Sequence, residues 1–225
     1  MISLRYRAAL FDLDGTLIDS AADLIASVRY ALASVFPGRD LPDGEDILVQ
    51  VGKPLEVIVR ELGYRAGEDD ARRFADVYRA NYAERFNEHT KPYPGVEELL
   101  GRLKAAGVKL ALVTTKHQTQ ADYTLEAFGL ARHFDYVHGW QEGREHKPHL
   151  EPVLTTLNRL GVQPGEAIMV GDSELDIESA KAAGAATCAV TYGFRPAWFL
   201  RSFHPDFLVS RAADIGPIGV STAQG

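Results

Sequence analysis

The chain has 225 residues, of which 46% are hydrophobic and 24% are charged, with a formal net charge of −7 and a pI near 5.5. These proportions are typical of a globular protein and exclude the disordered and fibrous classes. The acidic balance disfavours nucleic acid or an anionic membrane as a partner, because both reward clustered Lys and Arg.

Cysteine content and hydropathy further narrow the class of protein to which the chain can belong. The single cysteine, Cys188, excludes an internal disulfide, and its apolar neighbours in ATCAVTYG predict a core residue. The N-terminus lacks the apolar run of a signal peptide, and no segment approaches the roughly 20 apolar residues that cross a bilayer. We therefore expect a cytoplasmic protein, and the sequence leaves a monomer and a homodimer both open.

The first predicted element is a short buried strand at 8–11 (AALF), and the segment after it has a different character. The stretches 20–36, 54–63 and 68–89 have helical periodicity, and the segment contains no convincing strand. We expect a helical insertion over 19–92, with the prolines and glycine of KPYPG at 91–95 forming a hinge.

Beyond the insertion, short apolar runs alternate with helical patterns. Strands are expected at 108–113, 134–139, 167–171 and 186–192, with a candidate sixth at 206–210. Helices are expected at Val96–Ala106, Gln118–Phe128, Leu150–Leu160 and Glu174–Ala183, each followed by a glycine suited to a helix terminus. This alternation predicts an α/β fold with a doubly wound parallel sheet, and we expect the tail 219–225 to fray.

Polar residues follow the carboxyl ends of four predicted strands. They are Asp12 with Asp14, Thr114 with Thr115 and Lys116, Lys147 in the loop HKPH, and Asp172 with Asp176. Because ligands of open parallel sheets bind outside the carboxyl ends of the strands, we predict a site at this edge.

The residue types at this edge restrict its chemistry. Carboxylates held about 4 Å apart repel by a few kcal/mol per pair at an effective dielectric of about 20, so they need a cation among them. With no cysteine there and no His pair at metal-ligand spacing, Mg²⁺ fits best. A hydroxyl and a lysine suit the oxygens of a phosphoryl group, and a carboxylate can attack phosphorus.

The motifs DLDGTLIDS, LVTTK, KP and VGDSELDIESAKAAG resemble, in chain order, the four motifs of the haloacid dehalogenase superfamily. The stretches VGKPLEVIVRELG, YPGVEELLGRLKAAGVKLALVTTK and TYGF…PDFLV look most like its phosphoglycolate phosphatase group. The resemblance covers nearly the whole chain. It implies a Rossmann-like catalytic core of residues 1–18 and 93–225 and a helical-bundle cap of residues 19–92.

The resemblance also implies roles for the first motif and the last. Asp12 would be the nucleophile that forms an aspartyl-phosphate, with its other oxygen on Mg²⁺. Asp14 would be the general acid and then the base, steadied by Thr16, and its backbone carbonyl would reach the metal. Asp172 would be the third metal ligand. Asp176 would orient the metal's waters or Lys147, and it is also placed to form a helix capping box with Ser173.

The other motif residues would bind the substrate. Thr114 would hydrogen-bond a phosphoryl oxygen, and Lys147 would neutralise both the phosphate and Asp12. Thr115 replaces the Asn expected at this position, which leaves the contacts of that loop open. Lys53 in VGKPL is either a ligand for a carboxylate such as that of glycolate or a solvated lysine. Trp140 and Arg144 either shape the entrance of the site or pack on the surface.

These roles imply a Mg²⁺-dependent phosphatase of a small phosphorylated metabolite, with 2-phosphoglycolate as the expected substrate. The motifs say nothing of the leaving group. A pyrophosphatase, a sugar-phosphate or nucleotide phosphatase and a phosphomutase of the same superfamily therefore stay open. A catalytically idle phosphate-binding protein is disfavoured because every motif residue is present.

Overall fold

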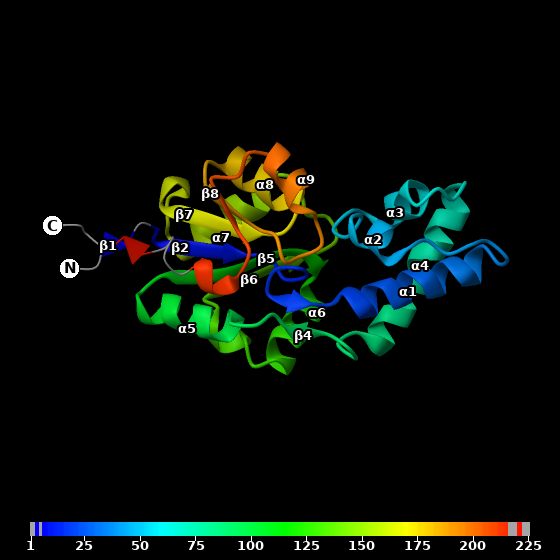
Figure 1. Ribbon diagram of the computed structural model, residues 1–225, viewed down its shortest axis with the longest axis horizontal. Helices are drawn as coiled ribbons and strands as arrows, with labels where there is room; N and C mark the ends of the chain where they lie inside the picture. Colours follow the sequence, from blue (N-terminus) through cyan, green and yellow to red (C-terminus); the bar gives the residue numbers. More distant parts are fainter. Residues whose placement is uncertain (1–2, 5, 216–219, 222–225) are drawn as a thin grey trace. The chain divides into compact units, whose positions relative to one another are not determined.

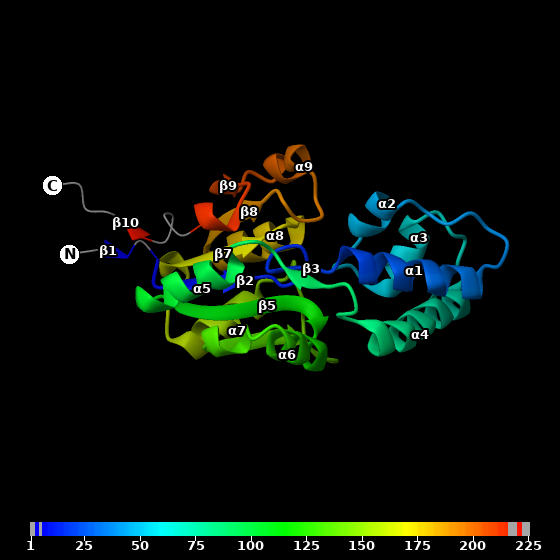
Figure 2. The same ribbon diagram turned by 60° about the horizontal axis from the view of Figure 1, so that its bottom comes forward.

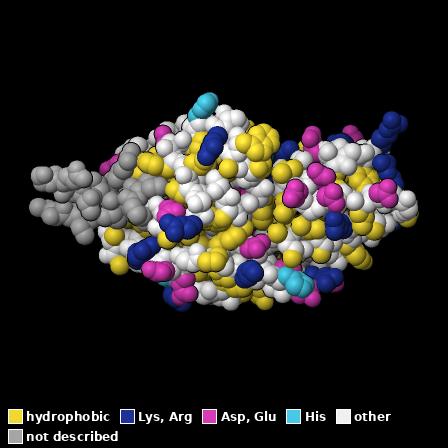
Figure 3. Space-filling model, in the orientation of Figure 1, with side chains coloured by type: hydrophobic (Ala, Val, Ile, Leu, Met, Phe, Trp, Pro, Cys, Tyr) yellow, Lys and Arg dark blue, Asp and Glu magenta, His cyan; other side chains and the backbone are white. Residues whose placement is uncertain are grey.

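The computed structural model describes residues 3–4, 6–215 and 220–221 and divides the chain into two compact units (Figure 1). The first, which we call the core unit, comprises Met1–Asp19 and Pro92–Gly225. The second, the helical unit, comprises Ser20–Lys91. Figure 3 shows acidic and basic side chains interspersed over one face of each unit, in keeping with the mixed charge of the sequence.

The core unit is built on a six-stranded parallel sheet. Its strands are β2 (Ala8–Phe11), β5 (Lys109–His117), β6 (Tyr136–Trp140), β7 (Ala167–Gly171), β8 (Ala186–Val190) and β9 (Phe207–Val209). Their spatial order is β6-β5-β2-β7-β8-β9, in which every neighbouring pair is parallel. Counted along the chain this is the order 3-2-1-4-5-6 of Rossmann folds, whose crevice lies beside the first strand. The predicted fold class is confirmed.

Helices cover both faces of this sheet. They are α5 (Val96–Ala105), α6 (Gln118–Ala127), α7 (Glu151–Leu160) and α8 (Glu174–Ala183), and the glycine after each has a positive φ as predicted. Alternate residues of a strand face opposite ways. Ala9 and Phe11 of β2 accordingly pack in one apolar cluster with α5 and α6, and Ala8 and Leu10 pack in another with α7 and α8. The central strand is therefore buried on both sides, which explains its unbroken apolar run.

The helical unit has an apolar core of its own. Its helices are α1 (Ala21–Val35), α2 (Gly44–Leu48), α3 (Leu55–Glu61) and α4 (Glu68–Arg85), and α1 packs against α4 (Figure 2). Val28, Leu32, Val59 and Phe74 are buried together at its centre. Within this unit Asp23 is buried and accepts hydrogen bonds from the backbone N–H groups of His89 and Thr90 and from the Thr90 hydroxyl.

The boundary between the two units corrects one expectation. We expected no strand over 19–92, but β3 (Ile18–Asp19) and β4 (Lys91–Pro92) pair as a two-stranded sheet where the chain leaves and re-enters the core unit. The Tyr93 N–H continues this pairing by donating to the Leu17 carbonyl at 3.0 Å. Two-residue strands depend on pairing across the chain and leave no periodic pattern in the sequence.

Other elements differ in extent or were not predicted. β5 continues through His117, so Thr114 and Lys116 belong to the strand itself. The helices α2 and α9 (Ala197–Ser202) are too short for a periodic signal. Within the tail, Val220–Ser221 form β10, which pairs with β1 (Ser3–Leu4), whereas residues 219 and 222–225 lie outside the described residues.

The structure also bears on the predicted burial of Cys188 and on the hydropathy of the helices. Cys188 is buried in β8, and burial raises the pKa of its thiol to about 12. Within the part of the chain that the structure describes, no helix combines the length and the apolar character needed to cross a bilayer.

Candidate active site

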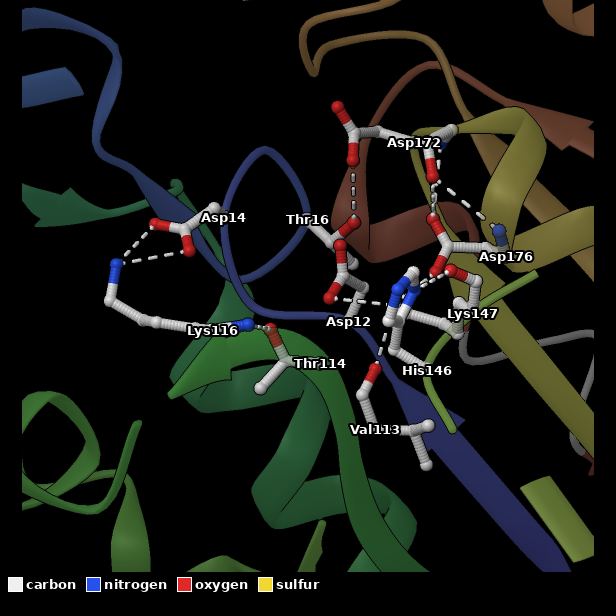
Figure 4. Close-up of polar contacts among 11 residues, drawn as sticks. Asp12, Asp14, Thr16, Val113, Thr114, Lys116, His146, Lys147, Asp172 and Asp176 are labelled. Carbon is white, nitrogen blue, oxygen red and sulfur yellow. Dashed lines mark hydrogen bonds and ion pairs between the residues drawn. The ribbon is translucent and has the colours of Figure 1, made fainter. Parts of the chain in front are cut away.

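The candidate site lies at the carboxyl end of the sheet, around the loop that follows β2 (Figure 4). Asp12 comes directly after this strand, and its N–H donates to the Val170 carbonyl of β7 at 2.9 Å. After it the chain turns tightly, with the N–H groups of Leu17 and Ile18 both donating to the Leu13 carbonyl. This turn fixes Asp12 and Asp14 at the edge of the sheet.

Lys147 lies at the centre of the buried charges. Its ammonium lies 2.9 Å from Asp12 Oδ1 and donates to Asp176 Oδ1 at 2.5 Å and to the Val113 carbonyl at 2.8 Å. Only 2% of the Lys147 side chain is exposed, so the ammonium depends on these three partners. Although burial acts to lower the pKa of Lys147, the carboxylates of Asp12 and Asp176 raise it. The lysine therefore stays charged.

The carboxylates of Asp12 and Asp176 contact this ammonium, and the carboxylate of Asp172 lies close to both of them. Asp12, Asp172 and Asp176 each offer an oxygen, and the three oxygens all lie within 4.8 Å of one another. Asp176 is engaged with both of its oxygens. Oδ1 accepts from Lys147, and Oδ2 accepts from the N–H and the hydroxyl of Ser173 at 3.1 and 2.6 Å. The predicted capping box at the start of α8 is thus present, and it fixes Asp176 beside Lys147.

The crowding of these acids changes their pKa values. Burial raises the pKa of Asp172 to about 8, and the neighbouring Asp12 and Asp176 add to the rise. Burial also raises the pKa of Asp12 to about 6, despite the opposing charge of Lys147. Burial is the main cause of both shifts, because it disfavours the charged form of a carboxylate, and the neighbouring acids add to it.

Asp172 is held in place from two sides. Its Oδ2 accepts from the Phe194 N–H at 2.6 Å, and its Oδ1 accepts from the Thr16 hydroxyl at 3.4 Å. Gly15 lies directly against the carboxylate, because a Cβ on Gly15 would fall 2.2 Å from Asp172 Oδ2. Gly15 also has φ +82°, a region that L side chains rarely adopt. We expected Thr16 to steady Asp14, whereas this hydrogen bond of its hydroxyl runs to Asp172.

Asp14 points away from the three carboxylates (Figure 4). Both of its oxygens accept from the ammonium of Lys116, each at 3.0 Å. The Lys116 N–H in turn donates to the Thr114 hydroxyl at 3.2 Å, which leaves the hydroxyl proton of Thr114 to be donated elsewhere. Of the three aspartates predicted as metal ligands, the structure brings the side chains of Asp12 and Asp172 together.

The remaining candidates lie outside this cluster. Thr115 is half-buried next to Thr114 in β5. Lys53 lies in the helical unit, where its ammonium donates to Gln50 Oε1 at 2.7 Å. Trp140 ends β6 and packs edge-on against His117, and Arg144 lies in the loop that follows, where its N–H donates to the Gln141 carbonyl.

Sequence reasoning gave no role to Lys116 or to Arg195. Lys116 carried a signal, because it stands two residues after Thr114 and a strand places such residues on the same face. Arg195 is 2% exposed and pairs with Glu174 at 3.0 Å, in the loop whose Phe194 N–H holds Asp172. An arginine in a loop after a strand is ordinarily solvated, so no sequence pattern indicated that Arg195 is buried.

The donor set fits a hard divalent cation. The ammonium of Lys147 contacts Asp12 and Asp176, and the charge of Arg195 acts to lower the pKa of Asp172, so the three buried carboxylates outnumber the cations that act on them. The ligands are oxygens alone, as Mg²⁺ prefers, and one or two carboxylates suffice for that ion.

Comparison with known proteins places this geometry in a family. Residues 9–190 match the haloacid dehalogenase-like hydrolase family. Pyrophosphatase PpaX of Bacillus velezensis is 37% identical over 215 residues, which cover 96% of this chain and 97% of that protein. Phosphoglycolate phosphatase of Aquifex aeolicus is 37% identical over 210 residues, which cover 93% of this chain and 94% of that protein. The crystal structure of a predicted phosphoglycolate phosphatase from Haemophilus somnus superposes with a TM-score of 0.85 and 31% identity, covering 95% of this chain and 98% of that one.

Proposed function

Because the chain belongs to the haloacid dehalogenase-like hydrolase family, we propose that it is a Mg²⁺-dependent phosphatase whose substrate is 2-phosphoglycolate. The family resemblance predicted from the four motifs is confirmed, and with it the assignment as a phosphoric monoester hydrolase. The metal, the substrate and the roles of the individual residues are the proposal.

The observation that carries the proposal is the cluster of Asp12, Asp172 and Asp176 around Lys147 at the end of β2. Such a cluster has too much negative charge for a structural ion pair and too little positive charge to bind a phosphate unaided. A divalent cation resolves both difficulties, since it neutralises the acids and attracts the phosphoryl oxygens.

In the first half of the reaction Asp12 attacks phosphorus with one carboxylate oxygen. The new bond joins Asp12 to phosphorus, the bond from phosphorus to the ester oxygen breaks, and Asp14 donates a proton to that oxygen. Lys147 lies beside Asp12 and would offset the charge of the phosphoryl oxygens while the phosphoryl group is transferred to Asp12. The hydroxyl of Thr114 would donate to one of these oxygens.

In the second half Asp14, now deprotonated, takes a proton from water, and the water oxygen attacks the phosphorus of the aspartyl-phosphate. The bond to Asp12 breaks, and phosphate leaves with Asp12 restored. Net, one phosphate ester and one water give one alcohol and one phosphate. A mutase would require a second acceptor hydroxyl in place of that water.

The metal would be held by Asp12 and Asp172 through their carboxylates and by Asp14 through its backbone carbonyl. Both oxygens of Asp176 are engaged with Lys147 and Ser173, which favours a supporting role for this residue over direct ligation. When bound, Mg²⁺ supplies charge neutralisation for the buried acids and for the phosphoryl group.

The substrate proposal is supported by the relatives named phosphoglycolate phosphatase, which align over almost the whole chain. A relative named as a pyrophosphatase is equally similar, so pyrophosphate is the principal competitor. The leaving group of 2-phosphoglycolate carries a carboxylate, and Lys53 of the helical unit is the residue we propose to bind it.

Two assays test the proposal. The purified protein should hydrolyse p-nitrophenyl phosphate with Mg²⁺ and lose this activity in EDTA. Asp12→Asn should lose all turnover, while the control Asp122→Asn, at an exposed position on α6, should retain it. Borohydride reduction of acid-quenched protein should locate the phosphorylated carboxylate at position 12. Turnover by Asp12→Asn at the wild-type rate would remove Asp12 from its role.

A substrate panel then separates the leaving groups. It compares kcat/KM for 2-phosphoglycolate, pyrophosphate, sugar phosphates and nucleotides, and Lys53→Met should raise KM for 2-phosphoglycolate without changing that for p-nitrophenyl phosphate. Best turnover of pyrophosphate would refute the substrate assignment, and an unchanged KM in Lys53→Met would remove Lys53 from substrate binding. Both results would leave the phosphoryl chemistry in place.

A further inference from the structure

Lys116 holds Asp14 in a symmetrical, buried ion pair. Its ammonium is 3.0 Å from Oδ1 and 3.0 Å from Oδ2 of Asp14, and the two side chains are 5% and 11% exposed. The pair joins the end of β5 to the loop after β2 across 102 positions of sequence. Removing two charges from water is costly, so buried groups such as Lys116 and Asp14 have to lie close to each other and be well oriented.

The position of this pair matters because of what lies nearby. Asp14 follows Asp12 by two residues, yet its carboxylate is turned from the cluster of Asp12, Asp172 and Asp176 (Figure 4). A cation that neutralises that cluster would also attract a fourth carboxylate within reach. A carboxylate drawn onto the metal would have one oxygen held by the cation and would be turned from the leaving oxygen that it has to protonate.

From this arrangement we propose that Lys116 is a positioning residue for the acid–base carboxylate. Its ammonium keeps Asp14 beside β5 and outside the metal cluster. From that position the carboxyl group of Asp14 can donate a proton to the leaving oxygen, and its carboxylate can then take a proton from the attacking water. The proposal rests on the proposed function, since it assigns Lys116 a part in the same reaction.

Lys116 also ties Asp14 to the phosphate-binding hydroxyl. Its N–H donates to Thr114 while its side chain binds Asp14, so one residue sets the spacing of both groups. A shift of β5 would therefore move the hydroxyl and the proton donor together. This coupling gives Lys116 an effect on proton transfer that a surface lysine on the same strand does not have.

A lysine that only braced the fold would also lower activity when removed, so the test needs a measurement specific to proton transfer. The ester oxygen of p-nitrophenyl phosphate leaves readily without a proton, whereas the oxygen of phenyl phosphate needs one. Because kcat/KM covers the steps up to the first bond cleavage, it reports this need directly.

The experiment compares kcat/KM of Lys116→Met and wild type across aryl phosphates from phenyl to p-nitrophenyl. We expect a loss of about 100-fold on phenyl phosphate and of less than 10-fold on p-nitrophenyl phosphate, within the usual range of general acid catalysis. Lys116→Arg should recover most of the loss, because it preserves the ion pair. Lys109→Met, at the opposite end of β5, is the control and should behave as wild type on both esters.

A double-variant cycle tests whether Lys116 acts through Asp14. Adding Lys116→Met to Asp14→Asn should cause no further loss of kcat/KM, because the carboxylate it positions is already gone. Equal losses on both esters, or fully additive losses in the double variant, would overturn the proposal. A rise in KM alone would likewise overturn it, since that result assigns Lys116 to substrate binding.

Separate controls distinguish a misfolded variant, and a failure of the proposed function, from a failure of the role proposed for Lys116. If Lys116→Met loses the wild-type circular dichroism spectrum, Lys116→Gln and Lys116→Arg carry the same comparison with a smaller change of side chain. If the wild type shows no Mg²⁺-dependent turnover of any ester, the proposed function fails first. If wild type turns over and the variants show no dependence on the leaving group, only the role of Lys116 fails.

Discussion

Replacing Asp172 by Asn should make the metal-free protein more stable while it abolishes catalysis. Asp172 is 2% exposed, and an oxygen of it lies within 4.8 Å of oxygens of Asp12 and Asp176. At that distance and an effective dielectric of about 20, each pair of charges repels by roughly 3 kcal/mol. The asparagine carbonyl can still accept from the Phe194 N–H, so the substitution removes charge with little loss of hydrogen bonding.

The size of the effect depends on pH, and its sign follows from the pKa. The pKa of Asp172 is raised from 3.8 to about 8 by burial and by the two neighbouring acids. Between these values the folded protein holds a proton that the unfolded chain has lost, so the free energy of unfolding falls as pH rises and levels off above pH 8. The whole shift corresponds to about 6 kcal/mol as an upper bound. After allowing for relaxation of the site and for the charge of Arg195, we expect Asp172→Asn to gain about 3 kcal/mol at pH 9.

Urea denaturation in EDTA at pH 5, 7 and 9 measures this gain. The variant should exceed wild type by an amount that grows with pH, while Asp122→Asn, at an exposed position, should match wild type throughout. With Mg²⁺ at about 100 times its Kd, the two proteins should become nearly equal in stability at pH 9. Bound ligand at 100 times its Kd stabilises wild type by about 2.7 kcal/mol, and the variant has lost one of the proposed ligands. Equal stability of the two proteins in EDTA at pH 9 would refute the claim that these carboxylates are crowded.

Three further substitutions test other parts of the structure. Gly15→Ala should lower kcat by more than 100-fold, because its Cβ would strike Asp172, whereas Gly107→Ala, with φ +84° and open space around it, should cost about 1 kcal/mol of stability and no activity. Asp23→Asn should cost about 2 kcal/mol at pH 7 in urea denaturation. Burial acts to raise the pKa of Asp23, but hydrogen bonds from Thr90 and His89 lower it overall. The stability difference between wild type and variant should therefore be fully present above pH 3.8, fall as the pH drops through the folded pKa, and vanish at lower pH. Lys147→Met should abolish turnover and, in EDTA at pH 7, cost about 3 kcal/mol because two buried carboxylates lose their counter-ion; unchanged stability would mean that those carboxylates are protonated.

The sequence predicted the centre of the sheet well because strands β2 and β7 are buried on both faces. β2 and β7 were predicted to the residue, since an unbroken apolar run bounded by polar residues is visible without any partner. The short elements behaved differently. β3 and β4 exist because two backbone segments pair where the chain changes units, and a pairing across more than 70 positions leaves no local pattern.

Within the site, sequence reasoning located the residues better than their contacts. It placed Asp12, Asp172 and Lys147 at one edge because the ends of parallel strands converge there. It could not show that Asp14 faces Lys116, since that depends on the tight turn at Gly15 and on the continuation of β5 past Thr114. Side-chain direction within a turn is set by tertiary packing, and the motif alone does not encode it.

The charges of the core unit also imply an order of binding. Phosphate esters are anions, and without a metal ion the cluster of Asp12, Asp172 and Asp176 opposes their approach, with Lys147 and the charge of Arg195 offsetting it in part. Once a divalent cation has neutralised the cluster, the ammonium and the Thr114 hydroxyl can act on the phosphoryl group alone. In the proposed mechanism the groups of this cluster act on the phosphoryl oxygens or the metal, or support groups that do, and none of them would distinguish glycolate from another leaving group. Selectivity must therefore come from residues outside it, which is why the motifs predict the reaction and leave the substrate to experiment.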